Sequence, residues 1–509
     1  MKRIITALLS LMMVSAISAQ TLNVHTDYVT YQYAAAEVGD VDYLSGTSLI
    51  ALGKSFALKD VKSMQVTDEE VTPNQVSVAY SESSAHVKVA GNIAKYVTVE
   101  VSGAHVSIVQ SDEVNDEVGE ISYVLSGTSA DGEFYMSGSY KATVEFNGLT
   151  LTNATPVYSG AAVCVMDGKR VNIKVVTGTT NTLTDAVSGN QKACLYVKGH
   201  VEFKQKGTLK VVGNYAHAIK AGEYLTIKNA DIQVLSAVGD GVNCSEYFLM
   251  ESGSLNIAKV GDEGIQCDVD GDASTGETAN HEGEDSGNIY ITGGVITVSA
   301  PRSEGIESKG AMTITGGEIK VEAYDDAINS SQDMTIEGGY IYARGSNNDG
   351  LDSNGNLYIK GGLVYAIGAR SPEVAVDANT EQNKKFYFTG GTLVAIGGLE
   401  NGSQLSQSCY STSSWNTNTW YAMTLDDQTI AFKTPASAGS TLVVSSSSTP
   451  ALKSGVTVSG GTEILDGMIF LNATTTGGSS VTLSSYTSSQ GGSPGGGGFP
   501  GGGRPGGWW

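Results

Sequence analysis

The chain has 509 residues, of which 64 are Gly and only 9 are Pro, and charged residues make up 16% of it. Asp and Glu outnumber Lys and Arg by 53 to 30, which gives a formal net charge of −23. Such a chain repels nucleic-acid phosphates and anionic membrane surfaces, so we expect no nucleic-acid partner. Glycine without a strict three-residue period also excludes a collagen-like fold.

The N-terminus predicts export. Two basic residues precede an apolar run from Ile4 to Ile17, and small residues follow it up to Ala19. This pattern is typical of a secretory signal peptide over residues 1–19, cleaved near Ala19. No later apolar run reaches the length of about 18 residues that a membrane span needs, so we expect a secreted or cell-surface protein.

The sequence predicts five regions along the chain. A flanking β domain precedes the repeats, a Ser/Thr-rich β region follows them, and the end of the chain is rich in Gly, Ser and Pro, which is typical of disorder. The predicted boundaries are residues 1–19 for the signal peptide, 20–120 for the N-terminal β domain, 121–400 for the repeat domain, 401–476 for a C-terminal β region and 477–509 for a disordered tail.

A repeat dominates the middle of the chain. Five segments carry a Gly-Gly pair between two short alternating apolar runs, and their first glycines are 23, 22, 23 and 29 residues apart. These first glycines are Gly293, Gly316, Gly338, Gly361 and Gly390. A second motif recurs with the same period and consists of an acid, a small residue, an aliphatic residue and a polar residue, as in residues 349–352.

Each period therefore contains three short alternating runs, and alternation indicates strands. Short strands that return every 22–23 residues, with glycine at the corners, predict an all-β parallel β-helix. A helical solenoid would need a 3.6-residue period, and a propeller would need about 40 residues per blade. The alternation also predicts which side chains stack inside successive coils: Ile296, Val298, Ile319, Val321, Ile341, Ala343, Val364 and Ala366.

The acidic residues of the second motif predict a calcium site. They fall in register in successive coils and form one column, and a second polar column that includes Asp377 lies beside it. Like charges about 4.8 Å apart repel, and a cation that takes six to eight oxygen ligands removes that cost. The alternative is a solvated acidic ridge, since Asp-Gly is good turn chemistry. The candidate calcium ligands are Asp240, Asn243, Glu263, Glu304, Glu307, Asp326, Asn329, Asp349 and Asp352.

Two cysteines occupy the same place in adjacent coils. Cys244 and Cys267 are 23 residues apart, where later coils have Ser308, Ser330 and Ser353. They could form a disulfide or an inward ladder of thiols. The ladder is favoured, because small residues fill this position in the other coils.

Three tyrosines are candidate sugar-binding residues. Tyr340, Tyr342 and Tyr365 fall on outward positions of adjacent coils. Exposed aromatic rings can stack on the apolar faces of sugars. The alternative is that they are ordinary outward strand residues, or that a terminal domain covers them.

The sequence does not predict an enzyme. It has no GxSxG nucleophile elbow, and its acids are too numerous to diagnose a glycosidase. A polysaccharide lyase would need calcium and a base, for which Arg302, Lys309, Arg344 and Arg370 lie near the acidic columns. Such residues could equally form ion pairs.

The coil motifs, together with the segment over residues 121–153, resemble a family of exported carbohydrate-binding β-helix proteins. Its first example is a clostridial protein that binds cellulose and polygalacturonate. The resemblance covers about residues 121–400 and implies a right-handed parallel β-helix with a shape like that of pectate lyases. It also implies calcium in the acidic column and binding, rather than strong cleavage, of acidic plant polysaccharide. The family's calcium motif matches at Asp240, Glu304, Glu307, Asp326, Asn329, Asp349 and Asp352, but not at His217 and Lys220.

The function expected from these observations is calcium-dependent binding of an acidic polysaccharide or of cellulose outside the cell. Two alternatives remain. One is a pectate-lyase-like enzyme, and the other is a structural or adhesive surface protein in which calcium only stiffens the coils.

Overall fold

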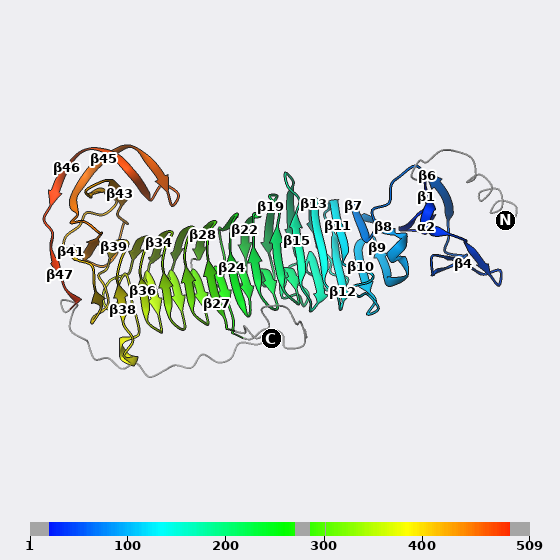
Figure 1. Ribbon diagram of the computed structural model, residues 1–509, viewed down its shortest axis with the longest axis horizontal. Coiled ribbons are helices and arrows are strands. Elements are labelled where there is room, and N and C mark those ends of the chain that lie inside the picture. Colours follow the sequence, from blue (N-terminus) through cyan, green and yellow to red (C-terminus); the bar gives the residue numbers. More distant parts are fainter. Residues whose placement is uncertain (1–19, 270–285, 301, 489–509) are drawn as a thin grey trace.

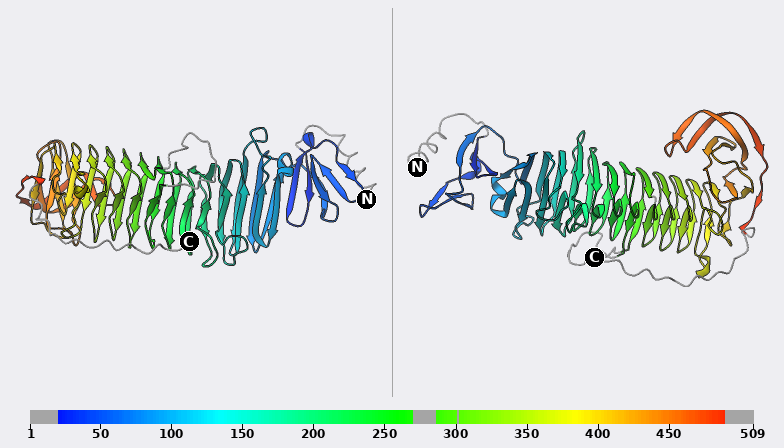
Figure 2. Two further views of the ribbon diagram at one scale, coloured as in Figure 1. Left: turned by 90° about the horizontal axis from the view of Figure 1, so that it is seen from below. Right: turned by 180° about the vertical axis from the view of Figure 1, so that it is seen from behind.

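The structure is a computed structural model that describes residues 20–269, 286–300 and 302–488. The predicted signal peptide, over residues 1–19, and the residues after 488 lie outside the described ranges. The protein is all-β and elongated: short strands stack along its length, with the N-terminal region at one end and the C-terminal region at the other (Figure 1, Figure 2). No described helix has the length and apolar character needed to cross a membrane.

Parallel pairing dominates the large sheets. In the repeat region each period contributes one strand to each of three rows, and each strand pairs in parallel with its equivalent in the next period. The first row contains β11 (Ile121–Ser129), β13 (Ala142–Thr152), β15 (Val171–Val175), β18 (Val201–Lys204), β21 (Leu225–Ile227), β24 (Tyr247–Met250), β27 (Asn288–Ile291), β30 (Met312–Ile314), β33 (Met334–Ile336), β36 (Leu357–Ile359), β38 (Phe386–Phe388) and β40 (Gln404–Leu405).

The other two rows run beside the first. The second row contains β16 (Thr180–Thr184), β19 (Thr208–Gly213), β22 (Asp231–Ala237), β25 (Ser254–Ile257), β28 (Val295–Ala300), β31 (Glu318–Ala323), β34 (Tyr340–Gly345), β37 (Leu363–Ile367) and β39 (Thr392–Ile396). The third row contains β10 (Ala104–Gln110), β12 (Gly132–Gly138), β14 (Val163–Asp167), β17 (Ala193–Val197), β20 (His217–Ala221), β23 (Val242–Cys244), β26 (Ile265–Cys267), β29 (Ile306–Ser308), β32 (Ile328–Ser330) and β35 (Leu351–Ser353). A short 3-10 helix, η2 (Thr380–Gln382), lies between β37 and β38.

The core follows the alternation of the sequence. Ile296, Ile319, Ile341 and Val364 are register partners in successive strands of the second row, and all four are fully buried. Their neighbours two positions along, from Val298 to Ala366, are buried in the same way. The predicted inward stack is confirmed, because side chains two residues apart lie on the same face of a strand.

The Gly-Gly pairs make the corner before each strand of the second row. The second glycine of each pair has a positive φ, for example +93° at Gly317 and +89° at Gly339. A Cβ on Gly339 would lie 3.0 Å from the carbonyl carbon and oxygen of Gly316 in the previous repeat. Glycine is needed here both for its backbone conformation and for the close approach of neighbouring repeats.

The N-terminal region joins the rows directly. Strand β7 pairs in parallel with β11, and β10 pairs in parallel with β12, so the rows begin within the range 20–120. The elements of this region that precede the three rows are β1 (Thr21–His25), β2 (Val29–Ala34), α2 (Ala35–Val38), β3 (Asp42–Leu44), β4 (Ser48–Ala51), β5 (Lys54–Ala57), β6 (Ser63–Thr67), β7 (Gln75–Glu82), β8 (Ser84–Ala90), η1 (Gly91–Tyr96) and β9 (Val97–Ser102).

The C-terminal region closes the other end and folds back over the second row (Figure 1). Strand β39 pairs with β44 in antiparallel fashion, which ends the parallel row, and four strands form a small closed barrel in the order β42-β43-β46-β45. Ordered strands extend into the range predicted as a disordered tail, since β46 continues to Val481 and β47 follows it. The strands of this region are β41 (Cys409–Thr412), β42 (Trp420–Thr424), β43 (Thr429–Lys433), β44 (Leu442–Ser445), β45 (Ala451–Ile464), β46 (Ile469–Val481) and β47 (Ser484–Tyr486).

The cysteines are buried free thiols. Cys244 and Cys267 are register partners in β23 and β26, and Ser308 continues the same column in β29. The structure therefore has the ladder of small side chains that the sequence favours at this position, and not a disulfide.

Candidate functional site

The acidic residues of the repeat gather at the third row. Asp240, Glu263, Glu304, Asp326 and Asp349 lie in the turns just before strands β23, β26, β29, β32 and β35. The second column comes from the middle residue of each strand, where Asn243, Gln266, Glu307, Asn329 and Asp352 are register partners. The predicted register of both columns is confirmed, and it brings all nine candidate calcium ligands to one edge of the molecule.

The first half of this edge, from His217 to Lys309, contains basic residues close to the column. His217 Nδ1 lies 3.2 Å from Asp240 Oδ2, Lys220 contacts Asn243, and Lys309 contacts Glu307. His217 Nδ1 also accepts the backbone N–H of Asp240 at 3.1 Å. These contacts place basic side chains beside this half of the column.

Glu263, in the first half, lies close to other acids. One oxygen from each of Asp240, Asp262 and Glu263 lies within 4.8 Å of the other two. Burial raises the pKa of Glu263 to about 9, and the neighbouring charges of Asp240 and Asp262 add to the rise. Asp262 stands outside the repeated motif, so the motif alone does not point to it.

The second half of the edge is acidic and lacks such partners. Asp349, Asp352 and Asp377 each place an oxygen within 4.8 Å of the other two. Among the described residues, no Lys or Arg forms an ion pair with any of them. The sequence places Asp377 in the second column, and the structure makes it the third member of this cluster, which we call the triple-aspartate cluster.

The electrostatics of the triple-aspartate cluster follow from burial and like charge. Burial raises the pKa of Asp349 to about 8, and the nearby carboxylates of Asp326 and Asp352 raise this pKa further. One hydrogen bond, donated by the Val374 N–H, acts in the opposite direction and lowers it. Burial, Asp349 and Asp352 raise the pKa of Asp377 to about 10. Carboxylates that stay ionised here need a nearby positive charge.

Calcium fits the carboxylates that converge at this cluster. Asn329 Nδ2 donates to Asp352 Oδ2 at 2.8 Å, which orients that carboxylate. Carboxylate and amide oxygens are the ligands that calcium prefers, whereas transition metals prefer sites with nitrogen or sulfur. Asp349, Asp352 and Asp377 are the residues that would hold the ion.

The tyrosines predicted to bind sugar do not form an exposed platform. Tyr340 is 39% exposed, but Tyr342 and Tyr365 are 1% and 0% exposed. Both point outward from the second row, as alternation predicts, and the barrel covers them: the Tyr365 ring packs 5.5 Å from Phe432, and its hydroxyl donates to Lys433 O. The prediction of exposed rings is wrong for these two residues, because the C-terminal region folds back over this face.

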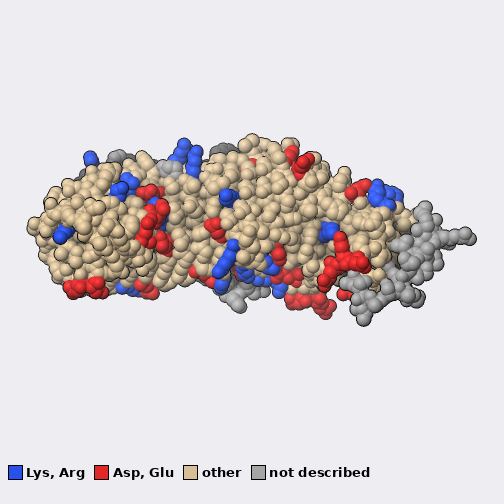
Figure 3. Space-filling model, turned by 90° about the horizontal axis from the view of Figure 1, so that it is seen from above, with Lys and Arg blue, Asp and Glu red and all other residues tan. Residues whose placement is uncertain are grey.

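A groove remains where the barrel overhangs the second row. It has a volume of about 780 Å³, and the second glycines of successive Gly-Gly pairs form its floor. Tyr340, Leu363, Ile430 and Leu471 are among the residues that line it, and the described lining includes no Lys or Arg. The surface on the barrel side of the molecule is largely uncharged, with Lys, Arg, Asp and Glu in scattered groups (Figure 3). Glu318 also lines the groove.

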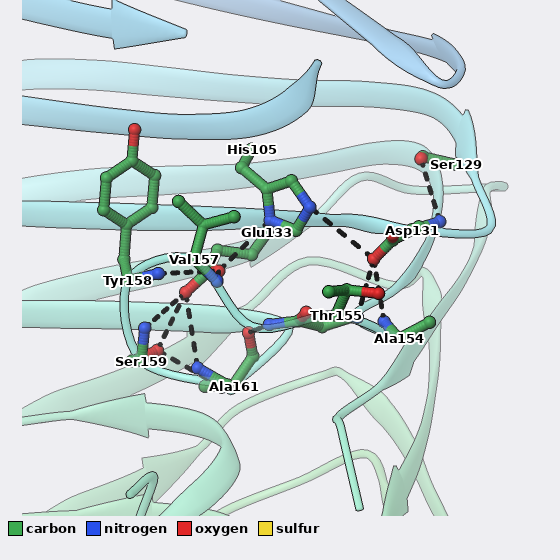
Figure 4. Close-up of polar contacts among 12 residues, drawn as sticks. His105, Ser129, Asp131, Glu133, Ala154, Thr155, Val157, Tyr158, Ser159 and Ala161 are labelled. Atoms are coloured by element: carbon green, nitrogen blue, oxygen red, sulfur yellow. Dashed lines mark hydrogen bonds and ion pairs between the residues drawn. The ribbon is translucent and has the colours of Figure 1, made fainter. Parts of the chain in front are cut away.

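A histidine and two acids form a further cluster near the start of the rows, which the sequence motifs do not reveal (Figure 4). His105 Nδ1 lies 3.2 Å from Glu133 Oε2, and His105 Nε2 lies 3.5 Å from Asp131 Oδ1. Glu133 is fully buried, and its two oxygens accept four backbone N–H groups from residues 157–160. Because its oxygens are occupied, Glu133 anchors this loop and is not available to a substrate.

Comparisons with known proteins found one solved structure and one family model that match this chain. A solved structure of a polysaccharide lyase-like protein from C. thermocellum, a gadolinium derivative, is similar at 18% identity and a TM-score of 0.34. That similarity covers 57% of this chain and 93% of the other. No curated protein matches. The sequence model of the family described as carbohydrate-binding domain-containing protein matches residues 102–367 and 286–467, which together span most of the chain. The chain therefore belongs to this carbohydrate-binding domain-containing family.

Proposed function

We propose that this protein is exported and binds polysaccharide in a calcium-dependent manner. Membership of the carbohydrate-binding family supports a polysaccharide as the partner. The observation that carries the calcium dependence is the triple-aspartate cluster, in which three carboxylates converge and no described Lys or Arg pairs with them. The three rows of parallel strands support a right-handed parallel β-helix as the scaffold.

The half-exposed members of the cluster suggest how an acidic polymer is held. Asp349 is 6% exposed, whereas Asp352 and Asp377 are only partly buried and lie at the edge of the molecule. Calcium held there would supply positive charge at the surface of a chain whose formal charge is −23. A uronate polymer would otherwise be repelled, so we propose polygalacturonate-like chains as the acidic ligand.

Two of the four candidate lyase bases, Lys309 and Arg344, are engaged by acids, which favours binding over cleavage. A lyase base must be neutral to remove a proton. Hydrogen bonding and charge attraction from Glu307 outweigh burial and hold the pKa of Lys309 above its ordinary value. Arg344 lies 3.6 Å from Glu322, so it is also engaged by an acid.

The test is affinity electrophoresis of the mature chain through gels that contain polygalacturonate, with calcium and again with chelator. We expect retardation only with calcium. A parallel gel with soluble cellulose derivative tests the groove, where retardation should not depend on calcium. Unchanged mobility in the polygalacturonate gels would contradict the acidic-glycan proposal, and unchanged mobility in every gel would contradict polysaccharide binding by these polymers.

A control variant separates the effect of net charge from the effect of the calcium site. Asp352→Asn removes one carboxylate of the triple-aspartate cluster, and Asp116→Asn removes an exposed carboxylate near the start of the rows. Both lower the net negative charge by the same amount. Only Asp352→Asn should abolish the calcium-dependent retardation.

A further inference from the structure

A second set of possible metal ligands lies away from the acidic columns. His200, Glu223 and Glu246 precede strands β18, β21 and β24 of the first row, so they come from three successive repeats and are spaced 23 residues apart. Their exposed fractions are 1%, 2% and 6%. One ligand atom from each lies within 4.8 Å of the other two. Two carboxylates and one imidazole are therefore enclosed together in the fold.

The contact between His200 and Glu246 does not have hydrogen-bond geometry. His200 Nε2 lies 3.2 Å from Glu246 Oε2, yet Glu246 Oε2 has no hydrogen-bond partner among the described residues. Two ligand atoms bound tetrahedrally to one zinc ion, each at about 2.0–2.1 Å, lie about 3.3 Å apart. The observed separation matches that of two ligands of one ion.

The His105–Glu133 pair shows what a satisfied pair of this kind looks like in the same protein (Figure 4). The carboxylate of Glu133 accepts four backbone N–H groups, which stabilise its charge without a metal. Glu246 is almost as deeply buried, but its Oε2 accepts no N–H group. A buried carboxylate without such donors is costly, and a cation removes that cost.

The surroundings hold these side chains in place. The His200 ring packs on Tyr224 with ring centres 4.4 Å apart, and Tyr224 stacks on Tyr247 at 4.8 Å. Glu246 has a φ of +53°, which is an uncommon backbone conformation for a residue other than glycine. Backbone strain of this kind clusters at sites where a side chain must be aimed.

We propose that His200, Glu223 and Glu246 bind one divalent transition-metal ion of the zinc type. Imidazole nitrogen and carboxylate oxygen both bind zinc, whereas calcium takes six to eight oxygens. The ion links three successive repeats of the first row. This site is independent of the calcium proposal, because its ligands lie in a different row from the triple-aspartate cluster.

The test measures metal content on the full mature chain. The protein is stripped with chelator, dialysed against Zn²⁺ with excess Ca²⁺, and analysed by elemental mass spectrometry. We expect one tightly held zinc ion in the natural chain. His200→Gln and Glu246→Gln should weaken zinc binding by more than about 100-fold, since loss of outer-shell partners alone costs about 10- to 100-fold.

His105→Gln is the matched control, because it removes a buried histidine beside a carboxylate that is already satisfied, and it should retain zinc. Absence of zinc from the natural chain, or equal zinc in all variants, would overturn the proposal. If the variants do not fold, X-ray absorption at the zinc edge of the natural chain decides. Scattering from one imidazole and carboxylate oxygens supports the site, and a spectrum without imidazole overturns it.

Discussion

At the scale of single residues, the partners of a buried charge decide its role. Glu133 is enclosed by backbone N–H groups, whereas Asp349 and Asp377 mainly meet other carboxylates. The first arrangement stabilises a loop, and the second raises the pKa values of the carboxyl groups, which supports the proposed cation site. All three acids are buried or half-buried, so burial alone does not distinguish an anchor from a binding site.

Glu133→Gln should lower the free energy of unfolding by about 3 kcal/mol at neutral pH, because an amide N–H₂ would face backbone N–H donors and the charge would be lost. Chemical denaturation monitored by circular dichroism measures the change. Glu145→Gln is the control: this half-buried acid pairs with Lys174 near the surface, and its loss should cost less than about 1 kcal/mol. Equal effects of both changes would contradict the anchoring role.

Glu133 also makes the stability of the protein depend on pH. Burial raises the pKa of Glu133, but the N–H groups of Ser159, Val157 and Tyr158 outweigh it, so the pKa in the folded protein lies below the ordinary value. Its stabilisation is present above the unfolded pKa, about 4.3, and disappears as the pH falls through the folded pKa. The stability difference between the natural chain and Glu133→Gln should therefore be constant near neutrality and shrink below about pH 4.

The triple-aspartate cluster predicts opposite effects with and without calcium. In chelator, Asp352→Asn should be at least as stable as the natural chain, because it removes like-charge repulsion. With calcium at about 100 times its dissociation constant, the natural chain should gain about 2.7 kcal/mol and the variant less. Melting curves in both buffers check this, with Asp116→Asn as the control. If calcium stabilised Asp352→Asn and Asp116→Asn by the same amount, the ion would bind elsewhere.

The sequence predicts the register of the acidic columns, since both follow the repeated motif. It cannot predict which acids lack a partner, because the neighbouring residues His217 and Lys220 come from a repeat that departs from the motif. The cluster of His200, Glu223 and Glu246 is equally hidden, because its members share a spacing of 23 but the first is a histidine and the other two are glutamates. Pattern alone identifies a column only where the residue type repeats.

At the scale of strands and turns, the alternation is strong enough to fix which side chains face inward. The Gly-Gly corners have an equally local cause, in backbone conformation and in contact between neighbouring repeats. These features depend on sequence neighbours and on the period of the repeat. They were therefore accessible from the sequence.

Gly339→Ala should destabilise the protein by about 2 kcal/mol, because alanine disfavours a φ of +89° and its Cβ would press on the backbone of the previous repeat. Gly460→Ala is the control, since its nearest neighbour is a Thr474 side-chain atom at an ordinary 3.4 Å. Denaturant midpoints compare the two variants. An unchanged midpoint for Gly339→Ala would show that the corner tolerates a side chain.

At the scale of the whole molecule, contacts between distant parts of the chain decide which faces are open. The pairing of β39 with β44 turns the chain back, and the barrel then covers Tyr342 and Tyr365. Alternation predicts that these rings leave the sheet, but it carries no information about what covers them. The groove beneath the barrel arises from the same long-range packing, so the sequence motifs do not reveal it.

The central claim is that calcium and polysaccharide bind to this protein cooperatively. Coupling of this kind is reciprocal, so each ligand must raise the affinity for the other by the same factor. The most direct test is calorimetric titration of oligogalacturonate into the mature chain, with calcium and with chelator. We predict an affinity at least about tenfold higher with calcium, which corresponds to about 1.4 kcal/mol. Equal affinity in the two buffers would contradict the claim.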